Sequence, residues 1–161
     1  MRLELLLKPM VAIATNKRAF FDYEILETYE AGLELFGFEV KSVKTGHISL
    51  GGSYIIIRPK PSGSVEAELL NAHIPPYQPK NAPASYEPYR TRKLLLHKSE
   101  IKALIGKSAQ KGLTLVPLRV YNKRGKIKLE FGLARSKKKQ DKRETIKRRE
   151  AEREIDRIMK T

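Results

Sequence analysis

The chain has 161 residues, of which 40% are apolar and 32% charged, enough for one folded domain with its own core. Its 33 Lys and Arg residues outnumber 18 Asp and Glu residues, and the resulting net charge of +15 and pI near 10 indicate a polyanionic partner such as a nucleic acid. Cysteine is absent, which excludes disulfides, thiolate metal sites and cysteine nucleophiles.

A cationic protein can also bind an anionic membrane surface, but this sequence offers little for that function. An interfacial helix needs a bulky apolar face, and the chain contains no tryptophan. No apolar run approaches the roughly 20 residues of a membrane span. Glu4 and Pro9 interrupt the apolar start too early for a signal peptide. We expect a cytoplasmic, soluble protein with no membrane partner, and residues 1–15 are interpreted as an N-terminal extension.

The first strand signal begins at Tyr23, where apolar and polar residues alternate with period two. This alternation is typical of an antiparallel strand with one solvated face. Gly32 within the strand predicts a bulge or a bend. Residues 37–46 follow between two glycines and predict a short helical turn, with Phe38 and Val43 packed inward and Glu39 exposed.

A hairpin and then a proline-rich segment follow. Residues 54–58 and 65–70 predict two strands joined by a Pro/Gly/Ser turn. Residues 75–89 hold five prolines and three tyrosines, which excludes a helix or a central strand and indicates a long surface loop. The cations Arg90, Arg92 and Lys93 come directly after it. Rings beside arginines can stack on bases and neutralise phosphates, so we favour RNA contact over a merely solvated loop end.

The second half of the body predicts a helix and a hairpin. Ser99 is suited to cap a helix that stops near Gly112. Residues 113–121 and 127–133 read as strands, and Pro117 favours an edge position or a bulge in the first of them. Five or six antiparallel strands in residues 16–133 predict a mainly β protein built on a small OB-type barrel. A split α+β sandwich is the alternative, because periodicity does not give strand order.

Residues 134–161 form a basic tail, with 12 Lys and Arg residues against 6 Asp and Glu residues. Asp141, followed by Glu144, predicts the cap of a helix. The apolar stripe of that helix is narrow, and an isolated helix of this length is marginally stable. We expect the tail to be disordered or helical, and to become ordered when it binds. The stripe comprises Ala151, Ile155, Ile158 and Met159.

Nothing in the sequence supports catalysis. The three histidines lack partners at metal-ligand spacing, and phosphate-loop, nucleophile-elbow and zinc-protease motifs are absent. We therefore expect no enzyme activity, no metal and no cofactor. Lys123 and Arg124, in the link between the last two strands, are interpreted as either a solvated tip or a phosphate contact. Glu39 reads as a surface acid, although an acid in a basic RNA site can accept hydrogen bonds from base amino groups.

Several segments, in this order along the chain, together resemble the SsrA-binding protein family, SmpB. The resemblance covers about residues 16–159. Its most specific parts are the run R-T-R-K-L-L-L-H at residues 90–97 and the D-K-R sequence at residues 141–143. Ser136 and Gln140 depart from the family pattern, which commonly has glycine and a ring residue there. An amide at position 140 can form hydrogen bonds with rRNA bases but cannot stack on them.

The resemblance implies an OB-fold body that binds the tRNA-like domain of tmRNA. It further implies a tail that enters the empty mRNA channel of a stalled ribosome, beside small-subunit rRNA, and licenses trans-translation. The expected protein is a monomer, and the alternative is a structural ribosomal or ribosome-assembly OB protein. By matching position, the body residues that face RNA are Asn16, Lys17, Glu39, Lys41, Arg90, Arg92 and Lys93. The tail residues at the decoding centre are Lys137, Lys138, Asp141, Lys142 and Arg143, and the charge pattern adds Lys139.

Overall fold

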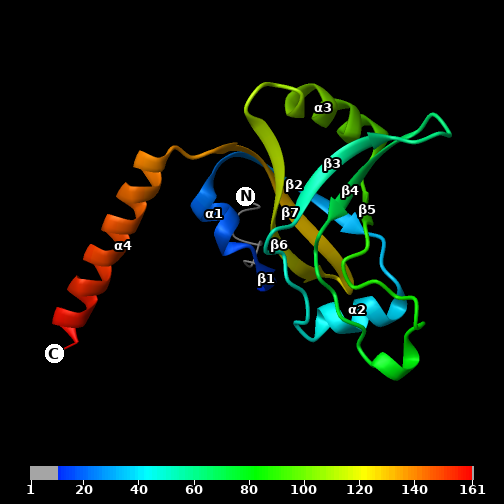
Figure 1. The fold of residues 1–161 in the computed structure, drawn as a ribbon, viewed down its shortest axis with the longest axis horizontal. Coiled ribbons are helices and arrows are strands. Elements are labelled where there is room, and N and C mark those ends of the chain that lie inside the picture. The colour runs from blue at the N-terminus through cyan, green and yellow to red at the C-terminus, as the bar shows by residue number, and fades with distance from the viewer. Residues whose placement is uncertain (1–10, 161) are drawn as a thin grey trace, which may run out of the picture.

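Seven antiparallel strands surround a common core in the computed structural model, which describes residues 11–160 (Figure 1). The strands are β1 (Ala12–Thr15), β2 (Tyr23–Leu33), β3 (Tyr54–Pro59), β4 (Val65–Leu70), β5 (Arg92–Leu95), β6 (Leu113–Lys123) and β7 (Lys126–Ser136). The helices are α1 (Lys17–Asp22), α2 (Gly37–Lys44), α3 (Lys98–Ser108) and α4 (Lys139–Met159), with a short 3-10 helix, η2 (Pro79–Asn81). None of the helices within residues 11–160 is long and apolar enough to cross a membrane.

The strand pairings close into a ring. Strand β2 pairs with β5 and β7, β7 with β6, β6 with β3, β3 with β4, and β4 with β5. Strand β1 lies beside the later part of β6. Closure removes the unpaired edges that an open sheet exposes. The prediction of a mainly β, antiparallel barrel with short helices is confirmed.

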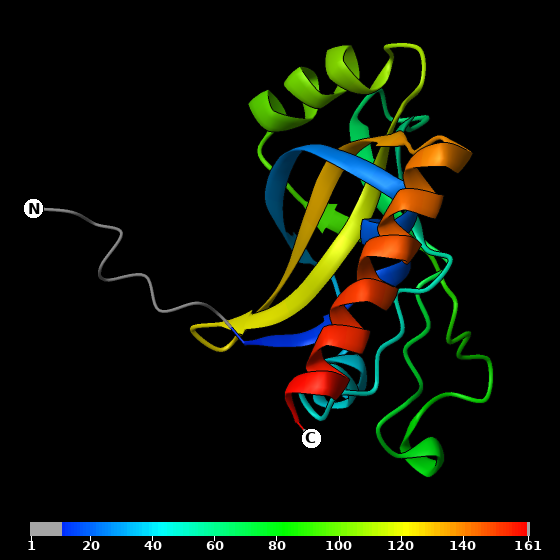
Figure 2. The same cartoon turned by 90° about the vertical axis from the view of Figure 1, so that its left-hand side faces the viewer.

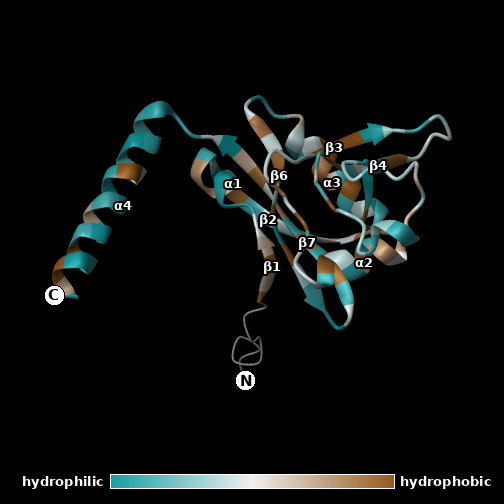
Figure 3. Ribbon diagram, turned by 60° about the horizontal axis from the view of Figure 1, so that its bottom comes forward, coloured by the Kyte–Doolittle hydropathy of each residue, from teal (hydrophilic) through white to brown (hydrophobic). Residues whose placement is uncertain are grey.

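Alternation along the strands builds the core as predicted. Leu129 and Phe131 of β7 are fully buried, and Ile127 and Leu133 are nearly so. Figure 3 shows apolar residues along the barrel strands, whereas α4 is mainly hydrophilic. A smaller apolar cluster under α1 includes Ala19 and attaches this helix to the outside of β6 and β7.

Two positions were expected to distort the strands, and one of them does. The register of β6 against β7 shifts between Pro117 and Arg119, so the bulge predicted at Pro117 is confirmed. At Gly32 a bulge or a bend was predicted; the register shift of β2 lies instead between Ile25 and Glu27, so the bulge is not at Gly32. Gly32 pairs with both β7 and β5, and a Cβ atom there would lie 3.2 Å from the Leu95 Cβ. The glycine therefore allows β5 to approach closely.

Strands β1 and β5 were not predicted. Each has four residues, which is too short for a clear periodic signal, and each is defined by its partners in the sheet. Strand β1 falls within the expected N-terminal extension, and β7 continues three residues beyond the expected end of the body. Helix α3 begins at Lys98 with His97 as its cap, so the prediction of Ser99 as the cap is wrong.

Helix α4 leaves the end of β7 and projects beside the barrel (Figure 2). It begins at Lys139, and Asp141 is its third residue. The Asp141 carboxylate accepts a hydrogen bond from the backbone N–H of Lys138 at 3.3 Å. Asp141 therefore lies within the first turn of the helix, and the N-cap residue is Lys138 and not the predicted Asp141. The apolar stripe of the helix is exposed along its length, with Met159 81% accessible.

Candidate nucleic-acid interface

A buried carboxylate organises the surface that borders the proline-rich loop. Glu39 is inaccessible, so the prediction that it is exposed is wrong. It is the third residue of α2, and its Oε1 accepts the backbone N–H of Phe36 at 2.8 Å. Arg92 Nε donates to its Oε2 at 2.7 Å, and Arg90 donates to both oxygens. The carboxylate thus ties α2 to β5 and to the end of the loop.

Arg92 is as deeply buried as Glu39, and its guanidinium fastens the 75–89 loop to the barrel. Neither side chain reaches the surface, and both hold Arg90 and the loop in place. The remaining donors of Arg92 are used on the Ala72 carbonyl at 2.7 Å, the Arg90 carbonyl at 3.2 Å, the Pro88 carbonyl at 2.9 Å and the Tyr86 hydroxyl at 3.0 Å.

The pKa of Glu39 lies below its usual value. Burial raises this pKa, but the hydrogen bond from Arg90, the backbone N–H of Phe36 and the charge of Arg92 together outweigh burial. A lowered pKa in the folded state means that the ionised carboxylate stabilises the protein above its unfolded-state pKa of about 4.3. This stabilisation is lost as the pH falls through the folded-state pKa.

We therefore expect acid to reduce the difference in stability between the wild type and Glu39→Gln. At neutral pH the variant lacks the ionised partner of two arginines, whereas below the unfolded-state pKa of about 4.3 protonation of the unfolded chain progressively removes the advantage of the ionised wild-type carboxylate. Urea denaturation of both proteins across this range gives the two free energies of unfolding. A difference that stays constant with pH would contradict the ionised network.

Arg90 is partly exposed and lies on an aromatic surface. Its guanidinium carbon is 4.1 Å from the centroid of the Phe36 ring, which stacks on Phe38 at 5.5 Å. Phe38 meets the edge of Tyr86, whose hydroxyl donates toward Glu39. These rings border a cavity of about 360 Å³. A partly exposed guanidinium beside the exposed Phe36 ring is suited to stack on unpaired bases.

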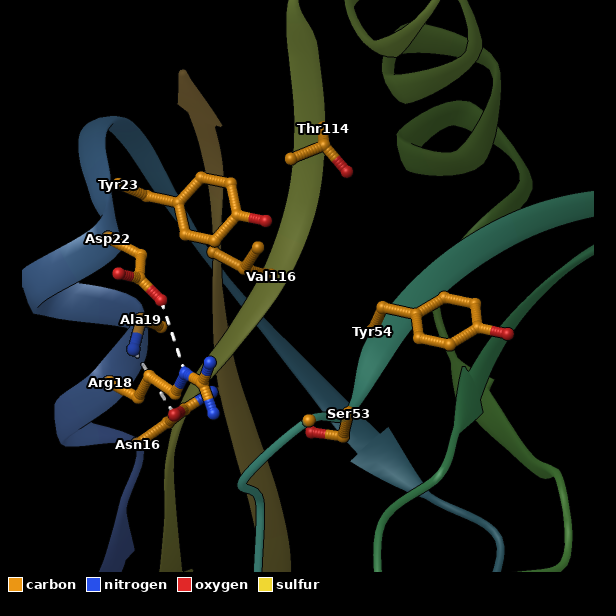
Figure 4. A pocket seen from close by; sticks show the side chains of 10 residues that line it. Asn16, Arg18, Ala19, Asp22, Tyr23, Ser53, Tyr54, Thr114 and Val116 are labelled. Carbon is orange, nitrogen blue, oxygen red and sulfur yellow. Dashed lines mark hydrogen bonds and ion pairs between the residues drawn. The ribbon is translucent and has the colours of Figure 1, made fainter. Parts of the chain in front are cut away.

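A second hollow, of about 450 Å³, lies between α1, β3 and β6 (Figure 4). Tyr23 and Tyr54 stand on opposite sides of it, and Arg18 binds Asp22 at its rim with an N–O distance of 3.3 Å. Asn16 also lines it, but its amide donates to the Pro117 carbonyl at 2.9 Å and accepts the N–H of Ala19. Asn16 therefore caps and anchors α1.

The other predicted body cations are exposed and spread over several elements. Lys17 and Lys41 lie on the surfaces of α1 and α2. Lys93 pairs with Glu66 at 3.2 Å, and Lys123 pairs with Glu30 at 3.2 Å. Arg124 occupies the turn between β6 and β7, in the left-handed region with φ of 52°. The structure brings Glu39, Arg90 and Arg92 together and leaves these cations apart from that cluster.

The predicted tail residues divide into two sets. Lys137 and Lys142 contact α1: the backbone N–H of Lys137 donates to the Asp22 carbonyl at 2.9 Å, and Lys142 Nζ lies 3.2 Å from an Asp22 carboxylate oxygen. The Lys142 hydrogen bond lowers the pKa of Asp22. Lys138, Lys139, Asp141 and Arg143 are exposed. The tail is thus anchored at its start and presents charge on its free side.

A family model described as SmpB protein matches residues 13–161. The chain belongs to the SmpB family. It is 53% identical to an SsrA-binding protein of Gloeothece citriformis and 50% identical to one of Thermosynechococcus vestitus, covering 92% of this chain and 92% and 94% of theirs. A solved structure described as "tmRNA-SmpB: a journey to the center of the bacterial ribosome" is similar at 46% identity and a TM-score of 0.61, covering 86% of this chain and 95% of that one.

Phe36 and Asp22 were missed from the sequence of this SmpB-family protein, whereas Tyr86 was covered as one of the loop tyrosines beside the arginines. Phe36 and Tyr86 form the aromatic surface around Arg90, and Asp22 joins α1 to the tail. One signal was available: Glu39 stands three residues after Phe36 at the start of a helix, the spacing at which an acid accepts the preceding backbone N–H. Asp22 carries no comparable local signal, because its tail partner Lys142 lies far away in the sequence.

Proposed function

We propose that this protein binds the tRNA-like domain of tmRNA and delivers it to stalled ribosomes, where the tail occupies the empty mRNA channel and licenses trans-translation. The observation that carries the proposal is a match along 92% of the chain to proteins named for binding SsrA RNA, at about half identity. The solved tmRNA-SmpB structure supports the ribosome as the second partner.

The barrel supplies the RNA-binding body in this proposal. Arg90 and the rings around it offer a stacking surface, whereas the exposed cations neutralise phosphates. Glu39, Arg92 and Asn16 hold the loop and α1 in place without touching RNA. The cations proposed to contact phosphates are Lys17, Lys41, Lys93, Lys123 and Arg124.

The tail supplies the ribosome contact. Its helix is almost entirely polar and exposed, so it lacks the apolar face that would bury it on the barrel. In this proposal the exposed Lys138, Lys139 and Arg143 bind rRNA phosphates at the decoding centre, and Asp141 and Gln140 form hydrogen bonds there. The proposed role is binding and licensing by a monomer in the cytoplasm, with no bond chemistry of its own.

Salt titration of tmRNA binding tests the proposal. Each neutralised phosphate releases counterions, so a protein with 6–10 such contacts is expected to lose roughly 10³–10⁵-fold in affinity between about 50 and 200 mM salt. Fluorescence anisotropy with the labelled tRNA-like domain measures this dependence. Lys41→Gln should reduce the slope of log affinity against log salt concentration by the value of about one phosphate contact. Glu100→Gln on α3, which also replaces one charged side chain by an amide, serves as the control.

A weak or flat dependence on salt would contradict the basic-surface model. Equal affinity for tmRNA, tRNA and unrelated duplex RNA would instead indicate a general ribosomal RNA-binding protein. These outcomes separate the proposed function from its structural alternative.

A further inference from the structure

The hollow beside Arg90 is walled by aromatic rings. It has a volume of about 360 Å³ and is lined by Phe36 and Phe38 at the start of α2 and by Tyr86, Glu87 and Arg90 of the loop. Phe36 is 51% exposed, which leaves much of an apolar ring uncovered. The hollow can therefore bury a planar group against this ring.

The charges around the hollow cancel. Arg90 and Arg92 carry two positive charges, and Glu39 and Glu87 carry two negative charges. A phosphate group binds where cations are in excess, as they are over the whole chain with its net charge of +15. The hollow is instead suited to an uncharged, planar part of a polyanion, and the base of an unpaired nucleotide is such a part.

Arg90 is fixed in place before any ligand binds. Its Nε donates to Glu39 Oε2 at 3.3 Å, and its terminal nitrogens donate to the Thr91 and Glu34 carbonyls at 3.4 Å each. Its guanidinium carbon lies 4.1 Å from the centroid of the Phe36 ring. Because these contacts already restrict the side chain, the stacking of a base on the guanidinium costs little further conformational entropy.

Glu87 brings a carboxylate to the same hollow. The Glu87 carbonyl accepts the backbone N–H of Arg90 at 3.1 Å, so a tight turn holds the two residues together. The Oε1 atom of Glu87 accepts the backbone N–H of Tyr89 at 3.1 Å, whereas its Oε2 makes no hydrogen bond with any residue in the range 11–160. Glu87 is an exposed residue, so a ligand with N–H groups can reach this free oxygen.

We propose that the hollow binds one unpaired base of RNA and that Glu87 makes guanine the preferred base. RNA as the ligand rests on the proposed function, whereas the preference among bases is a separate property of this site. The pairing edge of guanine has two adjacent donors, N1–H and the N2 amino group, which a carboxylate accepts together. In adenine and cytosine the amino group stands beside a ring nitrogen that accepts, and uracil has a single N–H between two carbonyls. Those acceptors repel the carboxylate.

Short single-stranded RNAs test the base preference on the full chain. The probes are four labelled heptamers, each with G, A, C or U at the centre of an otherwise all-uridine strand, and fluorescence anisotropy gives their affinities. The wild type is expected to bind the G heptamer about five-fold more tightly than the other three, the lower end of what a bidentate base contact contributes. Glu87→Gln should bring the four affinities close together, because an amide presents its own N–H donors to those of guanine.

Two further variants separate base binding from a general change of charge or fold. Glu100→Gln removes an exposed acid from α3 and should keep the preference for G. Phe36→Leu removes the ring and should weaken the binding of all four heptamers, since stacking contributes to every base. Chemical denaturation checks that each variant is folded. Equal affinities of the wild type for the four heptamers, a preference for G that survives Glu87→Gln, or unchanged affinities in Phe36→Leu would each overturn the proposal.

Binding of the tRNA-like domain is measured separately. If Glu87 sets a preference for G in the heptamers but the tRNA-like domain does not bind, the proposed function fails and the base site stands. If the tRNA-like domain binds and the heptamers show no preference, the base site fails and the proposed function stands.

Discussion

Replacement of Glu39 by alanine is expected to lower the free energy of unfolding by about 3–5 kcal/mol, the usual cost of removing one partner from a buried ion pair. The substitution leaves the fully buried Arg92 guanidinium without its carboxylate and removes the acceptor that holds Arg90. It also frees the backbone N–H of Phe36 at the start of α2. Chemical denaturation measures the change, and loss of the folded state in buffer would be its extreme form.

The matched control for this prediction is Glu27→Ala. Glu27 forms an ion pair with Lys107 at 2.8 Å, but both side chains are nearly half exposed. Water and salt ions replace such a pair readily, so the free energy of unfolding is expected to change much less for Glu27→Ala than for Glu39→Ala. Similar decreases in the free energy of unfolding for the two variants would show that the buried Glu39 carboxylate stabilises the protein no more than an exposed one.

Removal of the tail after Ser136 is expected to abolish peptide tagging on stalled ribosomes while leaving tmRNA binding within a few-fold of the wild type. Ser136 is the last residue of β7 and pairs with Tyr23, so this truncation keeps every strand of the barrel. It deletes α4 and the lysines that contact α1. A reconstituted rescue assay on ribosomes stalled at the end of a message measures tagging, and anisotropy measures tmRNA binding.

A chain ending at Met159 is the control for that truncation. It retains the whole of α4 and is expected to tag normally. Equal loss of tagging and tmRNA binding in the Ser136 truncation would contradict a division into an RNA-binding body and a ribosome-contacting tail. Normal tagging by the truncated protein would remove the tail from the proposed mechanism.

Local patterns predicted much of the fold. The alternation of Ile127, Leu129, Phe131 and Leu133 predicted a strand with one buried face, and this face lies in the core. Pro117 predicted a bulge because its missing N–H cannot join a regular ladder, and the register shifts there. Helix starts were less accurate, by two residues at α3 and three at α4, because several neighbouring side chains can satisfy the first turn.

The candidate site was predicted in its members but not in its arrangement. Arg90 and Arg92 were expected to act alike as RNA-facing cations, yet one is partly exposed and the other is buried. Arg90 lies two residues before Arg92, the first residue of β5, so alternation along a strand does not distinguish the two, and which of them is covered depends on α2 and the loop. The sequence pattern does not contain that information.

Residue types and short-range spacing were enough to predict the mainly β composition, the charged tail, the absence of cysteine chemistry and the resemblance to the SmpB family. The tertiary structure alone decided that Glu39 is buried between two arginines, that six strands close into a ring, and that Asp22 meets Lys142. Glu39 lies 51 and 53 residues from its arginine partners. Contacts at such separations depend on how the whole barrel closes, so the environment of these charges follows from the fold.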